Sequence, residues 1–136
     1  MKKVLSLTAF LVIAFFITAC GEDGVDYPVS YFNAEVQSSS TAGEAVTFKI
    51  TSEGFYPMAV EVTITAGTMT AFTVTDHKES GNWGGALIDD GDFIAAIIAN
   101  ANQLDQLDAE AGVTATSEAL MDVARAAMQH YATHYE

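Results

Sequence analysis

The chain has 136 residues, of which 50% are hydrophobic, and its 18 acidic against five basic residues give a formal net charge of −13. This length suits one small domain with its own hydrophobic core. So acidic a surface repels phosphate backbones and anionic lipid headgroups, which argues against any function in nucleic-acid binding.

The first twenty residues have the pattern of an export signal followed by an attachment site. Lys2 and Lys3 form a short basic region, and the apolar run over 4–19 is short for a membrane-spanning helix, so residues 1–19 predict a secretory signal peptide. Ala19 followed by Cys20, the only cysteine, resembles the lipobox of bacterial lipoproteins. That resemblance implies that Cys20 carries acyl chains such as palmitate and begins the mature chain. The alternative is a plain signal peptide followed by a free thiol, which is unusual in an exported protein.

The mature chain predicted by this cleavage, residues 20–136, is more acidic than the whole. Its three basic residues, Lys49, Lys78 and Arg125, stand against all 18 acidic ones, a formal net charge of −15. Such a charge suits a domain held near a membrane by acyl chains and not lying on its surface. We therefore expect a protein of the bacterial cell envelope, anchored through Cys20 on the extracytoplasmic side.

Three stretches of alternating apolar and polar residues predict β-strands after a lipidated N-terminus and tether over 20–44. Within the tether, Tyr27–Val36 is compatible with an edge strand after Pro28, and Gln37–Gly43 has the composition of a flexible polar loop. The alternation predicts strands over 46–51, 58–65 and 68–76, with a turn at Ala66–Gly67. The short connections between them imply an antiparallel meander.

The chain beyond these strands predicts one loop and two helices. His77–Asp90 has glycines beside Trp83 and is expected to be an irregular loop. A helix capped by Asp90 or Asp92 is expected to run to about Leu104, and an amphipathic pattern predicts a final helix from about Ser117. The predicted fold class is α+β, a small antiparallel sheet packed by two C-terminal helices.

Hydroxyl side chains gather where the last helix is predicted to begin. Thr114, Thr116 and Ser117 follow Gly112, and Thr116 or Ser117 is a suitable N-cap, with Glu118 in the first turn. The free backbone N–H groups of a helix N-terminus bind anions such as phosphate. An ordinary capped helix start explains the same pattern without a ligand, so spacing alone leaves both interpretations open.

Two stretches of the chain carry a family resemblance. Residues 54–80 begin with glycine and an aromatic residue, continue as two strands around a glycine turn, and end with His77, Glu79 and Ser80. Residues 107–117 read L-D-A-E-A-G-V-T-A-T-S and contain an acid, a glycine and a hydroxyl at matching places, namely Asp108, Gly112 and Thr114. Together they resemble the FMN-binding domain of NqrC- and RnfG-type redox-pump subunits and of small exported flavoproteins.

The resemblance implies a covalently bound flavin. In that family a flavin transferase moves an FMN unit from FAD to a threonine hydroxyl, which here is Thr114, in a domain spanning 45–136. Ala111 stands where the family has serine or threonine, and the β-branched Val113 replaces a small residue. Non-covalent binding through the same hydroxyls is therefore the alternative. The cofactor-binding residues that the resemblance implies are Asp108, Gly112, Val113, Thr114, Ala115, Thr116, Ser117 and Glu79.

The function expected from these features is electron transfer to or from a redox partner protein, not conversion of a substrate. The flavin carries the electrons while the protein supplies position and electrostatics. Phe55, Tyr56 and Trp83 are candidate stacking partners for its ring. A competing hypothesis is a non-catalytic surface lipoprotein, an adhesin or antigen, that keeps the fold without the cofactor. His130 and His134 have the i, i+4 spacing of a metal pair, but no third ligand is evident, so no metal is expected.

Overall fold

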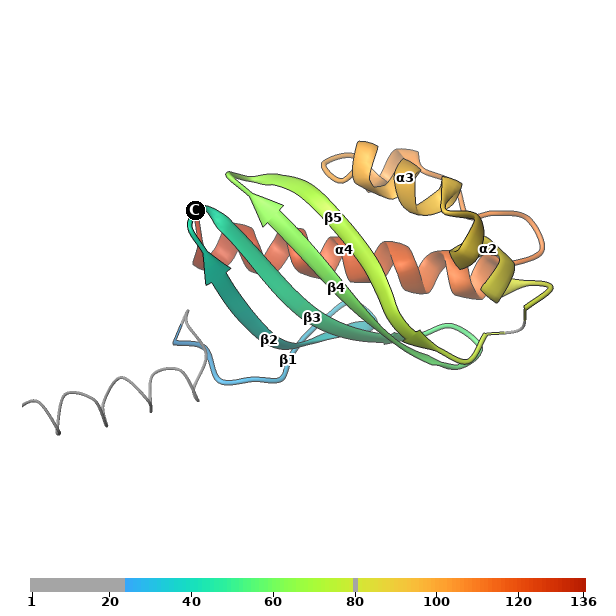
Figure 1. Ribbon diagram of the computed structural model, residues 1–136, viewed down its shortest axis with the longest axis horizontal. Helices are drawn as coiled ribbons and strands as arrows, with labels where there is room; N and C mark the ends of the chain where they lie inside the picture. Colours follow the sequence, from blue (N-terminus) through green and yellow to red (C-terminus); the bar gives the residue numbers. More distant parts are fainter. Residues whose placement is uncertain (1–23, 80) are drawn as a thin grey trace, which may run out of the picture.

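The computed structural model describes residues 24–79 and 81–136 and contains a β-sheet and a layer of helices (Figure 1). The predictions for residues 1–19 and Cys20, and the match at Ser80, lie outside the described residues. The strands are β1 (Val29–Tyr31), β2 (Ala34–Ala42), β3 (Ala45–Glu53), β4 (Pro57–Thr65) and β5 (Thr68–His77). They are followed by α2 (Gly84–Asp90), α3 (Asp92–Ala99), a short 3₁₀ helix (Leu104–Gln106) and α4 (Thr114–His134).

The strands form an antiparallel meander in the order β1-β2-β3-β4-β5. β3 and β4 pair without interruption, from Ala45 opposite Thr65 to Glu53 opposite Pro57. At the β4–β5 turn, Ala66 and Gly67 have φ angles of 51° and 83°. Two consecutive positive φ angles define the type I′ turn that suits a two-residue hairpin. The predicted α+β class, the three alternating strands and this turn are confirmed.

α4 packs along one face of the sheet and completes the core (Figure 1). Alternate residues of β3 and β4 turn inward and are buried, among them Phe48, Ile50 and Val62. The buried face of α4 is rich in small residues such as Ala124 and Ala127, which allow a close approach between helix and sheet. With 21 residues, α4 is about 31 Å long and contacts β1 to β4, while α3 packs on β5.

The prediction of a flexible polar loop over Gln37–Gly43 is wrong, because most of this segment belongs to β2. Residues 38–42 pair with residues 45–49 of β3, so cross-strand hydrogen bonds hold a stretch with little apolar pattern of its own. The predicted edge strand over Tyr27–Val36 is divided between β1 and β2 by a turn at Phe32–Asn33.

The helical predictions need three corrections. Residues 84–90, placed in the predicted loop, form α2, so the described chain has three α-helices where two were expected. α3 ends at Ala99, not near Leu104, and its N-cap is Gly91, not Asp90 or Asp92. The last helix begins at Thr114, and Val113 occupies its N-cap position without a side-chain hydrogen bond. In the part of the chain that the structure describes, no helix has the length and apolar character needed to span a bilayer.

Candidate functional site

The first turn of α4 presents backbone donors that no acceptor within the helix satisfies. The N–H of the N-cap residue, Val113, donates to the Glu110 carbonyl at 3.2 Å, and the N–H of Ser117 donates to the Val113 carbonyl at 3.0 Å. Helix geometry therefore leaves the N–H groups of Thr114, Ala115 and Thr116 without an intrahelical acceptor. The Thr114 residue is exposed and Ala115 is half-buried, so a hydroxyl and the N–H groups of these two residues are available to an anion, whereas Thr116 is fully buried.

The other two hydroxyls of the cluster, those of Thr116 and Ser117, lie inside the protein, because both residues are fully buried. Ser117 Oγ donates to the Val113 carbonyl at 2.8 Å and accepts the Glu110 N–H at 3.1 Å, which ties the loop before α4 to its first turn. Thr116 Oγ1 has no hydrogen-bond partner among the described residues. The prediction that Thr116 or Ser117 caps the helix is wrong, because both lie inside its first turn.

Two glycines bring distant segments against the buried Thr116. A Cβ atom on Gly54, between β3 and β4, would overlap Glu79 Oε1 and lie 3.1 Å from Thr116 Cα. A Cβ on Gly84, the first residue of α2, would overlap Thr116 Oγ1. Any other residue would push these segments away from the start of α4, so both positions require glycine for close approach. Gly54 is the first residue of the family motif, whereas Gly84 was predicted only as one of the glycines of an irregular loop, with no role in the site.

A cavity of about 380 Å³ opens beside the first turn of α4. Its wall contains three large aromatic side chains, Phe55, Tyr56 and Trp83, which are 70%, 52% and 61% exposed. The only other exposed large hydrophobic side chain among the described residues is Phe32. Concentrated exposed aromatic surface of this kind marks a binding site more often than it reflects chance. The remaining lining residues are Glu79, Gly84 and Gly112.

Glu79 forms the polar part of this cavity. Its side chain is 7% exposed, and its Oε1 accepts the N–H of Phe55 at 3.2 Å, so the carboxylate fixes the backbone that carries two of the aromatic residues. Gly112 lies beside Trp83, where a Cβ atom would stand 3.7 Å from the tryptophan ring. Because Thr114 is two residues further on, the aromatic cavity and the open helix N-terminus are adjacent.

The remaining residues that the family resemblance implied for the site differ in their solvent exposure. Asp108 is exposed in the loop that precedes α4, while Val113 and Ala115 are half-buried. His77, which matched the first motif, is the last residue of β5 and is half-buried. The structure thus brings Glu79, Gly112 and Thr114 to one region and keeps the hydroxyls of Thr116 and Ser117 inside.

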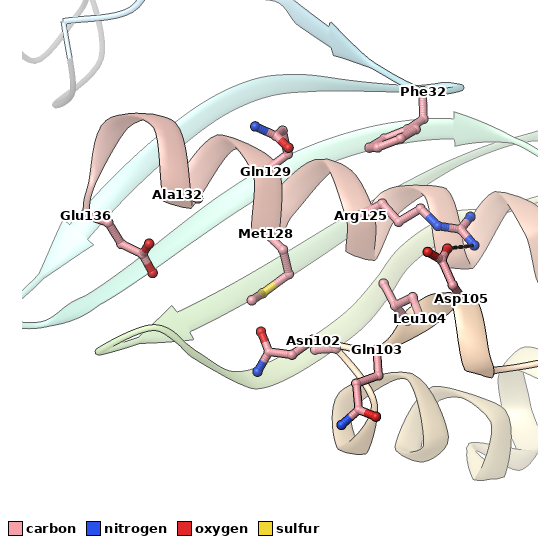
Figure 2. A pocket seen from close by; sticks show the side chains of 11 residues that line it. Phe32, Asn102, Gln103, Leu104, Asp105, Arg125, Met128, Gln129, Ala132 and Glu136 are labelled. Atoms are coloured by element: carbon pink, nitrogen blue, oxygen red, sulfur yellow. Dashed lines mark ion pairs between the residues drawn. The ribbon is translucent and has the colours of Figure 1, made fainter.

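A second hollow, of about 480 Å³, is shown in Figure 2 and lies along the outer side of α4. Arg125 is its cation, but the guanidinium is 2.9 Å from Asp122, 3.8 Å from Asp105 and 3.9 Å from Glu118. A cation already matched by three carboxylates has little attraction left for an anionic ligand. This hollow is also three turns of helix away from Thr114, so we do not assign it to the same site.

The two histidines of α4 are part of an aromatic cluster. His130 is buried and contacts the hydroxyls of Tyr27 and Tyr31, at 3.0 Å from Nε2 and 2.9 Å from Nδ1. The His134 ring lies 4.5 Å from the His130 ring. Within residues 24–79 and 81–136, no group of three or more His, Cys, Asp or Glu side chains is arranged to hold a metal ion.

The cavity and the helix terminus together suit a ligand with a flat apolar ring and an anionic tail. The aromatic walls match the ring, and the exposed Thr114 with its backbone donors matches the tail. FMN has this composition, an isoalloxazine ring joined to a phosphate, so the residues present fit it.

Comparison with known proteins agrees with this geometry. The family model described as FMN-binding domain matches residues 54–129, a stretch that includes every cavity residue and Thr114. The chain has no significant match among curated proteins or among solved structures. Because the family model covers more than half of the 136 residues, the chain belongs to the FMN-binding domain family, and FMN is its cofactor.

Proposed function

We propose that this protein is a lipid-anchored electron carrier of the bacterial cell envelope, with FMN attached to Thr114 through a phosphoester bond. The observation that carries the proposal is the position of the Thr114 hydroxyl. Among the three hydroxyls at the start of α4 it alone belongs to an exposed residue, and it follows Gly112, which lines the aromatic cavity, by two residues at the open N-terminus of the helix.

Attachment requires an accessible hydroxyl and donors for the phosphate. Thr114 Oγ1 would lose its proton and form a bond to the FMN phosphorus of FAD, while the pyrophosphate bond breaks and AMP leaves. A flavin transferase would catalyse this step during maturation. Val113 is half-buried, and Thr114 next to it remains an exposed residue despite the bulk of the valine. The N–H groups of Thr114 and Ala115 are suited to hold the phosphate oxygens.

A covalent bond has a clear advantage for an exported protein. Free flavin is dilute outside the cytoplasm, and a reversibly bound cofactor dissociates whenever its concentration falls below Kd. A tethered cofactor keeps a high effective concentration that does not depend on the medium. The predicted signal peptide and the acylation site at Cys20 support export and anchoring, and neither needs a membrane-spanning helix.

An electron carrier fits this site better than an enzyme with its own substrate. Bound FMN supplies one- and two-electron redox chemistry, and the chain's residues bind and orient it. The aromatic walls are open to solvent, so a partner protein can approach the ring closely. Glu79 orders the backbone of Phe55 and so positions one wall of the ring site.

The test is the mass and fluorescence of the denatured protein. The full-length chain is expressed in a host that has its flavin transferase, and we expect a mass increase equal to FMN less one water, with yellow fluorescence that migrates with the protein on a denaturing gel. Thr114→Ala should remove both signals. Thr116→Ala is the matched control and should retain them, because the Thr116 hydroxyl is buried. A wild-type chain with the mass of the bare polypeptide would exclude covalent attachment, and a flavin titration would then test reversible binding.

A further inference from the structure

The aromatic rim of the flavin cavity continues into another hollow, distinct from the one in Figure 2, which Trp83 also lines. This hollow has a volume of about 500 Å³, and Trp83 is the one residue that lines both. Half-buried Leu87 and Val113 supply apolar surface, while Asp90, Asp92 and Glu110 supply three carboxylates. We call this second space the acidic hollow. It lies where α2, the start of α3 and the loop before α4 meet, at the end of the molecule where α4 begins (Figure 1).

The carboxylates of the acidic hollow are not neutralised by the protein itself. Asp90, Asp92 and Glu110 are exposed, and their side chains have no hydrogen bond or ion pair among the described residues. All ion pairs between described residues involve Arg125, which belongs to the hollow of Figure 2. The three carboxylates are also not arranged to share a metal ion. The negative potential of these three carboxylates can therefore attract cationic groups that are spread over the surface of another protein.

Exposed aromatic side chains next to unpaired charges are typical of a surface that binds another protein. Solvent-exposed tryptophan and tyrosine are the residue types that most often dominate interface energy. The face of a tryptophan ring also attracts lysine and arginine side chains. Complementary charge increases the rate of encounter and sets the orientation of a complex, and both are needed when a carrier must bind and release its partner quickly.

We propose that Phe55, Tyr56, Trp83 and the acidic hollow form the docking face for a basic redox protein. A lysine or arginine of the partner enters the acidic hollow beside Trp83, and the partner's apolar patch covers the aromatic rim above the flavin cavity. Because Trp83 lines both spaces, this orientation brings the partner's redox centre close to the flavin. The inference rests on the proposed electron-transfer function and adds the chemical class of the partner and the place where it binds.

Two triple variants separate local recognition from overall charge. The first, Asp90→Asn with Asp92→Asn and Glu110→Gln, removes the three charges of the acidic hollow. The control, Glu44→Gln with Glu61→Gln and Glu136→Gln, removes three charges from the β2–β3 turn, from β4 and from the C-terminus, none of which line either space. Both variants have the same net charge, so a difference between them reports the location of the charges.

The binding measurement does not depend on the flavin. The full-length Thr114→Ala chain in non-ionic detergent is titrated with a lysine-rich monohaem c-type cytochrome, and quenching of Trp83, the only tryptophan, reports binding. We expect binding that weakens with salt and that is about tenfold weaker when the acidic hollow is neutralised, with less than about a threefold change in the control. An acidic cytochrome should not bind.

The second measurement uses the protein that carries FMN. The second-order rate of electron transfer to the same basic cytochrome should fall in the acidic-hollow variant and remain near the wild-type value in the control. Equal losses in both triple variants, or no quenching of Trp83 at low ionic strength, would overturn the docking face. If the chain carries no FMN, the proposed electron-transfer function fails, yet the Trp83 titration still gives its own result on the docking face.

Discussion

The substitution Gly84→Ala tests whether α2 must lie directly against the start of α4. The added methyl group would overlap Thr116 Oγ1 and lie 3.0 Å from Glu79 Cβ. Thr116 and Glu79 are both buried, so neither side chain can rotate into solvent to make room. The chain must instead move α2 away from α4 or distort the wall of the flavin cavity, which Gly84 also lines.

The expected loss of stability follows from two opposing contributions. Forcing one extra methyl group into a packed site costs about 1–3 kcal/mol. Replacing glycine by alanine within a helix returns about 0.5–1 kcal/mol, because alanine loses less backbone entropy on folding. The central values of these two contributions leave a net cost of about 1 kcal/mol, so we expect Gly84→Ala to lower the free energy of unfolding by about 1 kcal/mol and to reduce the FMN content of the purified protein.

Urea unfolding of four proteins measures this effect: wild type, Gly84→Ala, Thr116→Ala and the double variant. Removing the Thr116 hydroxyl should relieve the overlap, so the two changes should be non-additive by at least about 0.5 kcal/mol. Gly81→Ala is the control, because a Cβ atom there would meet nothing within 4 Å. A Gly84→Ala protein as stable as the wild type, or strict additivity with Thr116→Ala, would refute the close approach.

Three further predictions use other contacts. Ser117→Ala should lower the free energy of unfolding by about 1–3 kcal/mol, because it leaves the Glu110 N–H without its buried acceptor; chemical denaturation measures this, and an unchanged midpoint would contradict it. Tyr31→Phe removes the 2.9 Å hydrogen bond to His130 Nδ1 and should cost about 0.5–1.5 kcal/mol in the same assay, whereas no loss would show that this contact adds nothing. Cys20→Ala should abolish labelling by radioactive palmitate and release the protein from the membrane fraction, and retention of the label would refute the lipid anchor.

The central strands could be predicted from the sequence because their pattern reflects burial on one side. Residues 46–51 and 58–65 alternate between apolar and polar types, and a half-buried strand is the structure that this period fits. The second half of β2 escaped prediction because it is mostly serine and threonine, which carry no such pattern. Hydrogen bonds from β3 hold it in the sheet, and those depend on a partner, not on the segment itself.

The family motifs in the sequence predicted a set of site residues, but only the tertiary structure distinguishes their environments. Thr114, Thr116 and Ser117 are chemically similar and adjacent, yet Thr114 alone is exposed. For Thr116 the distinction comes from Gly54 and Gly84, which lie 30 or more positions away in the chain and pack against this residue. The fold class and the main strands could be predicted from the sequence alone, since both follow from local pattern. The tertiary structure decided which hydroxyl is accessible and brought Phe55, Tyr56 and Trp83 around one cavity, because accessibility depends on the segments that the fold packs together.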